Sequence, residues 1–101
     1  MTERIAIDDA LSQARRIAAA IVAGEIAAYE GGMRVWKEVI DRLAQRCPDQ
    51  LWPFKANASA IEDTRWNAGN GGHDNPALIA QCEQEIIAAA RQLLTEETTD
   101  D

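Results

Sequence analysis

The sequence is short of several residue types on which whole classes of protein depend. One histidine, two cysteines and five aromatic side chains occur among its 101 residues. Cys47 and Cys82 stand far apart and form no CxxC pair, so neither a zinc site nor a disulfide framework is expected. We expect both thiols to lie in the core as small apolar side chains, in a protein of the reducing cytoplasm.

Long apolar runs are missing as well. The longest, IAAAIVA at residues 17–23, is much too short for a bilayer, which takes about 20 residues to cross. The N-terminal MTERIAIDDA has no cationic start followed by a long apolar run, so no secretory signal is expected. No segment alternates β-branched and polar residues as a strand does. We therefore predict an all-α protein that does not associate with membranes.

Positive charge is scarce. Ten basic residues stand against 17 acidic ones, a net charge of −7, and residues 51–101 hold nine of the acids and three of the bases. Non-specific binding to nucleic acid needs a basic face that displaces counterions, so this function is excluded. The acidity favours solubility; the alternative is an acidic face for a basic partner, or mimicry of nucleic acid.

Motifs for phosphate binding and catalysis are also lacking. The segment NAGNGGHDN at residues 67–75 lacks GxxxxGK[ST] and follows a predicted helix, so it is no phosphate loop, and no GxGxxG occurs. His73 in this segment has no further zinc ligands beside it, and nothing local prepares Ser12 or Ser59 as a nucleophile. We predict no catalytic residue, no metal and no cofactor.

Helical periodicity, in contrast, extends over nearly the whole chain. It predicts four helices: from Ile5 or Asp8 to Ala23, from between Ile26 and Gly31 to Arg46, from Gln50 or Pro53 to Thr64 or Trp66, and from Pro76 to Leu94. Gly24 ends the first helix, and Asn75-Pro76 caps and opens the last. Residues 1–4 and 95–101 are expected to be disordered, and 67–75 to form a loop. The prediction is one domain over residues 1–101, an antiparallel four-helix bundle.

The segment 24–63 organises the predicted fold. Two helical stripes follow each other in it: Ile26, Tyr29, Met33, Trp36, Ile40, Leu43 and Cys47, then Leu51, Phe54, Ala58 and Ile61. We predict that the two stripes pack together as a helical hairpin. Gly31-Gly32 marks a weak helix start, a kink or a close approach of another backbone. Because the outer helices have broader apolar faces than one small monomer covers, we expect a homodimer or higher oligomer.

Four carboxylates around this hairpin are candidates for a shared site. Glu25, Glu30, Glu62 and Asp63 could converge as a divalent-metal site or an acid–base pair. The plainer interpretation is a solvated helix face, or ion pairs with Arg34 or Arg65.

Aromatic residues give the second indication of a site. Trp52 and Trp66 flank the third helix instead of lying on its apolar stripe, so they could rim a pocket or a subunit interface. The candidate binding residues are Glu25, Tyr29, Glu30, Arg34, Trp52, Asn57, Ser59, Glu62, Asp63 and Trp66.

Two segments carry a recognisable pattern. GEIAAYEGGMRVW at residues 24–36 fits GExxxYEGxxxxW, and PFKANASAIED at residues 53–63 fits PFxxxASxxED. With these motifs the sequence resembles a family of small bacterial all-helical proteins of uncharacterised function, of the kind found among mobile integron gene cassettes. The resemblance implies no activity. It implies that Glu25, Tyr29, Glu30, Glu62 and Asp63 are the first polar residues to consider.

Three functional hypotheses follow. The first is a non-enzymatic, self-associating cytoplasmic helical protein that binds a protein partner, as an accessory, immunity or antitoxin protein does. The second is a module for a small ligand, with a polar cleft between the second and third helices. The third is a divalent-metal-dependent enzyme that uses the four carboxylates.

Overall fold

The computed structural model describes residues 4–69 and 75–98, and it is built from helices. The four α-helices are α1 (Ile7–Val22), α2 (Ala28–Arg34), α3 (Trp52–Gly69) and α4 (Pro76–Thr98). Directly after α2 come a π-helical turn, η1 (Val35–Val39), and a 3₁₀ turn, η2 (Ile40–Arg42). The described residues form no β-strand, only an isolated parallel bridge between Ile5 and Leu43. The predicted all-α fold with four helices is confirmed.

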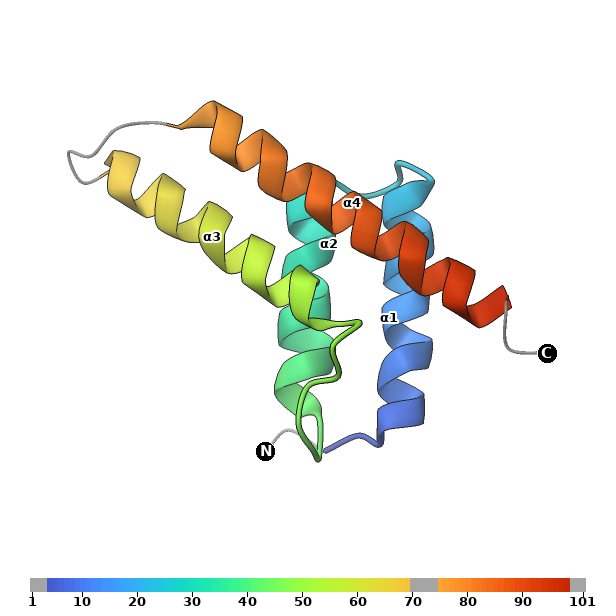
Figure 1. Ribbon diagram of the computed structural model, residues 1–101. Helices are drawn as coiled ribbons and strands as arrows, with labels where there is room; N and C mark the ends of the chain where they lie inside the picture. The colour runs from blue at the N-terminus through green and yellow to red at the C-terminus, as the bar shows by residue number, and fades with distance from the viewer. Residues whose placement is uncertain (1–3, 70–74, 99–101) are drawn as a thin grey trace.

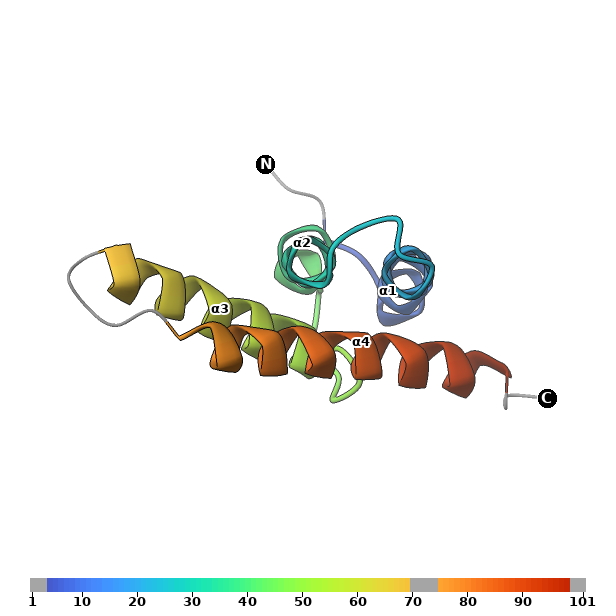
Figure 2. The same ribbon diagram turned by 90° about the horizontal axis from the view of Figure 1, so that it is seen from above.

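The helices form two layers. In Figure 1, α1 and α2 stand side by side, and α3 and α4 form a second pair that crosses the first. Figure 2 shows α1 and α2 nearly end-on, both on the same side of the α3–α4 pair. The bundle is therefore two crossed helical pairs, and the C-terminal end of α3 projects past α2 with the start of α4 (Figure 1).

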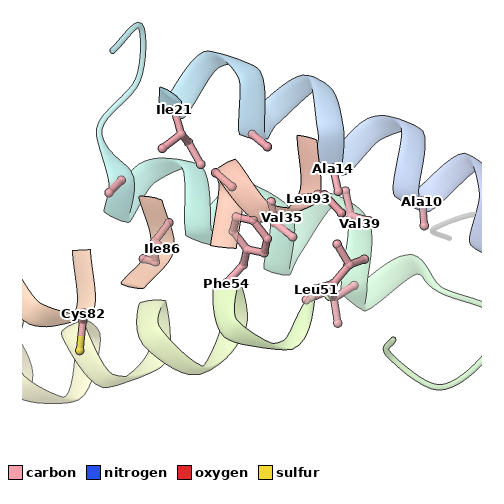
Figure 3. Close-up of a cluster of buried hydrophobic side chains, with 14 of the residues drawn as sticks. Ala10, Ala14, Ile21, Val35, Val39, Leu51, Phe54, Cys82, Ile86 and Leu93 are labelled. Atoms are coloured by element: carbon pink, nitrogen blue, oxygen red, sulfur yellow. The ribbon is translucent and has the colours of Figure 1, made fainter. Parts of the chain in front are cut away.

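The core lies where the two layers meet. Phe54 points from α3 into its centre, toward Val35, and is fully buried (Figure 3). Three alanines at spacings of four, Ala10, Ala14 and Ala18, are also fully buried and give α1 a smooth face for close packing. The predicted second stripe is confirmed, since all four of its positions have no exposed surface: Leu51, just before α3, and Phe54, Ala58 and Ile61 within it.

Two helix boundaries form as the local sequence predicts. Gly24 has a φ of 79°, and the N–H groups of Gly24 and Glu25 donate to the carbonyls of Ile21 and Ala20 at 3.1 and 2.9 Å. This is the Schellman arrangement, which satisfies carbonyls at the end of α1. At the start of α4, Asn75 Oδ1 accepts the N–H of Leu78 at 3.2 Å, as an N-cap does.

The predicted stripe of the second helix is wrong in its first half. Ala28, Gly31, Gly32 and Val35 are buried there. The predicted Tyr29, Met33 and Trp36, which follow Ala28, Gly32 and Val35 by one residue each, are only half-buried, although Tyr29 still packs against the core. At the π-helical turn both Val39 and Ile40 are buried, and the predicted positions Ile40 and Leu43 then lie in the core. A π turn holds one extra residue, so it shifts the inward face by one position.

The glycine pair is a place of close approach, one of the three roles considered for it. A Cβ built on Gly32 would lie 3.0 Å from Ile86 Cδ1 and 3.3 Å from the carbonyl oxygen of Phe54, and one on Gly31 would overlap the Ile21 side chain. These glycines therefore let α2 lie close to its three neighbouring helices.

Several predicted boundaries need correction. The second helix ends at Arg42, not near Arg46, because the chain turns to pair with the N-terminal segment: Ile5 N–H donates to Arg42 O at 2.8 Å, and the Arg4 guanidinium donates to Leu43 O at 2.8 Å. Arg4, which is expected to be disordered, is therefore held in place by this hydrogen bond. Helix α3 extends to Gly69 and α4 to Thr98, into the predicted loop and tail. Residues 1–3, 70–74 (with His73) and 99–101 lie outside the described residues.

The two thiols differ in burial. Both are free, and Cys82 is buried in the core as predicted, whereas Cys47 is only half-buried because its helix has already ended. Burial raises the pKa of both thiols; for Cys47, Lys55 partly offsets this and Asp49 adds to it.

Candidate binding site

A second stripe runs along α3, one residue on from the buried one. Its members are Trp52, Lys55, Ser59, Glu62 and Trp66, at spacings of three, four, three and four residues. This spacing places them on one side of the helix, turned about 100° from the buried stripe. The two indoles are exposed, by 53% for Trp52 and 69% for Trp66, and the residues between them are half-buried.

Residues of the preceding helix lie beside this stripe at two levels. The Tyr29 hydroxyl donates to Glu62 Oε1 at 3.3 Å, and Lys55 Nζ lies 5.6 Å from the centroid of the Trp36 ring. Four of the five aromatic residues of the chain are thus grouped along α2, η1 and α3, and Phe54 alone is in the core. We call this surface the aromatic face; it consists of Tyr29, Trp36, Trp52, Lys55, Ser59, Glu62 and Trp66.

One end of the aromatic face is a shallow, open pocket. It has a volume of ≈ 530 Å³ and is lined by Tyr29, Glu62, Asp63, Arg65 and Trp66. The guanidinium carbon of Arg65 lies 4.6 Å from the centroid of the Tyr29 ring, so the cation stacks on the ring. Two carboxylates against one guanidinium leave this end acidic, next to an exposed indole.

The environment of Tyr29 follows from these contacts. Burial raises the pKa of its hydroxyl above the ordinary value, and the Glu62 carboxylate raises that pKa further by its charge and its hydrogen bond. The cation of Arg65 acts in the opposite direction. Tyr29 is therefore a protonated donor at neutral pH, which orients Glu62.

The other end of the face is basic. Lys55 Nζ lies between two indoles, 5.6 Å from the Trp36 centroid and 5.8 Å from the Trp52 centroid, and Lys37 Nζ lies 3.8 Å above the Trp36 ring. Within residues 4–69 and 75–98, no carboxylate forms an ion pair with either ammonium group. A second pocket, of ≈ 310 Å³, adjoins Trp52 and is lined by Arg46, Cys47 and Asp49.

Five of the ten predicted site residues thus lie along one surface, Tyr29, Trp52, Ser59, Glu62 and Trp66, and Asp63 borders it. The other four are used differently. Arg34 pairs with Glu38 at 3.3 Å, and Asn57 Nδ2 donates to the carbonyl of Pro53 at 2.8 Å. Glu25 and Glu30 are exposed.

The carboxylates do not assemble as a metal site needs. In the described part of the chain, no three side chains of histidine, cysteine, aspartate or glutamate are grouped so that they could hold a metal ion. Of the predicted partners of Glu62 and Asp63, Arg34 pairs elsewhere and Arg65 lies over Tyr29. This geometry gives no support to the metal-enzyme hypothesis.

Sequence reasoning missed three members of the site, Lys55, Trp36 and Arg65. The sequence predicts Trp36 in the core, and Arg65 only in an ion pair. The signal for Lys55 was present, because it completes the 3–4–3–4 spacing between the two tryptophans, but a stripe of mixed chemistry does not show up in a search for apolar periodicity.

Comparisons of the chain with protein-family models, with curated proteins and with solved structures found no match. Among the described helices, none has both the length and the apolar character that a membrane span requires. The function must therefore be argued from the aromatic face.

Proposed function

We propose that this is a non-enzymatic interaction protein that binds a helix of a partner protein across the aromatic face. The observation that carries the proposal is the exposure of Trp52 and Trp66 at the two ends of one helical stripe, with a cation and a carboxylate between them. An accessory role of the immunity or antitoxin kind is one form that such binding takes. With two free thiols, we place the protein in the reducing cytoplasm.

Burying an exposed indole in an interface releases free energy, because its apolar surface is removed from water. Covering the exposed part of each one is worth about 2–4 kcal/mol before the cost of association is subtracted. Tryptophan, tyrosine and arginine are also the residues that most often dominate binding energies. The aromatic face and its border hold all three types: Trp52 and Trp66, Tyr29 and Arg65.

The charges of the face specify what the partner carries. Lys55 would pair with a carboxylate of the partner helix. Glu62 and Asp63 would pair with a lysine or arginine of that helix, about two helical turns from the carboxylate. An amphipathic helix laid over the junction of α2 and α3 supplies both charges and an apolar strip. The small-ligand alternative places its cleft at the same junction, but the pocket there is open, whereas small-molecule sites bury most of the surface of their ligand.

Selection from a displayed library of helical peptides tests the proposal. We expect enriched peptides to bind the protein with dissociation constants of about 100 µM or tighter, and to lose at least about tenfold in affinity with Trp66→Ala. The matched control is Leu78→Ala, which truncates another exposed apolar residue (38% exposed) on α4 and should leave affinity unchanged.

Two results contradict the proposal. One is a selection that yields no peptide in this affinity range. The other is a set of peptides whose binding responds to Leu78→Ala as strongly as to Trp66→Ala. A peptide that binds more weakly as salt increases would further identify Lys55 and Glu62 as contacts, because exposed ion pairs are screened.

A further inference from the structure

The second stripe of α3, from Trp52 to Trp66, has nearly the same spacing in both chain directions. Counted from Ser59, its other members lie at −7 (Trp52), −4 (Lys55), +3 (Glu62) and +7 (Trp66). Both ends are exposed indoles, the intermediate positions carry opposite charges, and the centre is a small hydroxyl. The stripe is therefore complementary to an antiparallel copy of itself.

We propose that the helix bound across the aromatic face is α3 of a second copy of this chain, antiparallel and related by a two-fold axis near Ser59. This inference rests on the proposed function and names its partner. In such a pair each Lys55 meets a Glu62, to within about one residue or 1.5 Å of helix rise, and each Trp52 meets a Trp66. Symmetry makes every contact occur twice, as in the isologous dimers that most homo-oligomers form.

The centre of the stripe suits a helix crossing. Ser59 is half-buried and is flanked along the helix by the small residues Ala56 and Ala60. Small side chains at a crossing allow the two helix axes to approach to the lower end of the usual 8–10 Å range. The large indoles lie two turns away on each side, where they close the ends of the contact.

Charge also favours this arrangement over other self-contacts. Residues 34–55 hold five basic and three acidic residues, a net +2, so the remainder of this −7 chain carries −9. An antiparallel copy brings the basic end of each face to the acidic end of the other, whereas a parallel copy would oppose like charges. The repulsion between two −7 chains is screened beyond about 8 Å at physiological salt, while the half-buried Lys55 and Glu62 side chains, paired in contact, are screened much less.

The N-terminus of α3 adds to the attraction. Lys55 lies in the first turn of α3, which has no acidic residue of its own. A helix N-terminus favours negative charge, so a carboxylate brought by the second copy gains from the helix dipole as well as from the lysine. The partly exposed Lys55 is available for this contact.

Charge reversal with concentration-dependent sizing tests the proposal. We expect the wild-type protein to pass from 11.1 kDa to about twice that mass as concentration rises. Lys55→Glu and Glu62→Lys each oppose like charges twice in the dimer and should weaken association at least about tenfold, whereas the double variant restores the pairs and should recover it. Glu85→Lys is the matched control, because it makes the same charge change as Glu62→Lys on an exposed residue of α4 outside the aromatic face, and it should leave association unchanged.

A cross-linking experiment locates the axis. In a Cys47→Ser background, Ser59→Cys should form a disulfide-linked dimer under mild oxidation, since the two Cα atoms must come within about 4.4–6.8 Å. Asn67→Cys, on an exposed position near the end of α3, should not. Cys82 is buried and stays unreactive in the folded protein.

The outcomes separate this inference from the proposed function. A wild-type mass that stays at 11.1 kDa at every concentration, or a double variant that fails to recover association, overturns the α3 dimer. Equal cross-linking of Ser59→Cys and Asn67→Cys overturns the axis. If the selected peptides still lose affinity with Trp66→Ala in those cases, the aromatic face binds another protein and the proposed function stands.

Discussion

The inner and outer faces of α3 are one residue apart in the sequence and differ in what they contact. Phe54, Ala58 and Ile61 have no exposed surface, whereas Lys55 and Glu62, each one residue further on, are half-buried and reach across to residues of the preceding helix. A turn of about 100° around one helix axis separates the two environments.

We expect the two faces of α3 to serve two purposes whose energies are separable. The inner face joins the two helical layers, so its side chains determine the stability of the fold. The outer face ends in exposed indoles, and its side chains are those that we propose for association. Substitutions on the inner face should lower the free energy of unfolding, and those on the outer face should change binding with little effect on that free energy.

The largest expected effect is that of Phe54→Ala. Phe54 is fully buried at the centre of the core, so its truncation should lower the free energy of unfolding by about 3–5 kcal/mol. Trp66→Ala removes a larger side chain from a position that is 69% exposed, and should cost less than about 1 kcal/mol. Urea denaturation of both variants measures the difference. Equal losses would mean that the two faces are not distinct.

The second largest loss of stability is expected from Gly32→Ala, where α2 lies close to the inner face of α3. Gly32→Ala places a Cβ 3.0 Å from Ile86 Cδ1 and 3.3 Å from the Phe54 carbonyl oxygen, and should cost about 1–3 kcal/mol in the same measurement. Gly69→Ala, near the C-terminus of α3, meets no atom within 4 Å and should change stability by no more than about 0.5 kcal/mol. A neutral Gly32→Ala would show that α2 can move away from α3 without loss.

Much of this fold can be predicted from short-range signals. The inner stripe of α3 follows from its apolar spacing, and Gly24 and Asn75 end and begin helices through their own backbone and side-chain chemistry. Such signals depend on residues within one or two turns of each other, and therefore remain readable in a single sequence.

The rotation of the second helix could not be predicted in this way. Its inward positions Ala28, Gly32 and Val35 are small, and the larger Tyr29, Met33 and Trp36 beside them dominate the apolar pattern. Small residues fit there because other helices approach closely, and a single sequence does not reveal this approach. The π turn then changes the register once more.

The same rotation explains which site residues were found. Tyr29, Trp52, Ser59, Glu62 and Trp66 are each predicted from the sequence, but their common surface depends on the half-buried Tyr29 and Trp36 lying beside α3. Glu25, in the turn after α1, and Glu30, on α2, are both exposed to solvent, and the described residues hold no group of three or more possible metal ligands, so the predicted convergence of four carboxylates does not occur there.

The smallest expected effect is the titration of Tyr29, where the outer face meets α2. Tyr29 is the only tyrosine, so phenolate absorbance reports its hydroxyl alone. Because burial and Glu62 raise its pKa, we expect the folded protein to titrate above the ordinary value of 10.0. Glu62→Gln removes the charge and should lower the pKa, whereas Glu30→Gln, on an exposed residue of the same helix as Tyr29, should leave it unchanged.

The raised pKa also has a consequence for stability, with a definite sign. Between pH 10 and the pKa of the folded state, the unfolded chain has already lost the tyrosine proton while the native protein still holds it. Stability therefore falls as pH rises through this window, and its contribution from Tyr29 is complete only below pH 10. Tyr29→Phe should lose no more than about 1 kcal/mol at neutral pH and show a shallower decline above pH 10. An identical decline in stability above pH 10 for wild type and Tyr29→Phe would mean that Tyr29 is solvated and does not contact Glu62. The contact between α2 and the outer face of α3 would then be absent.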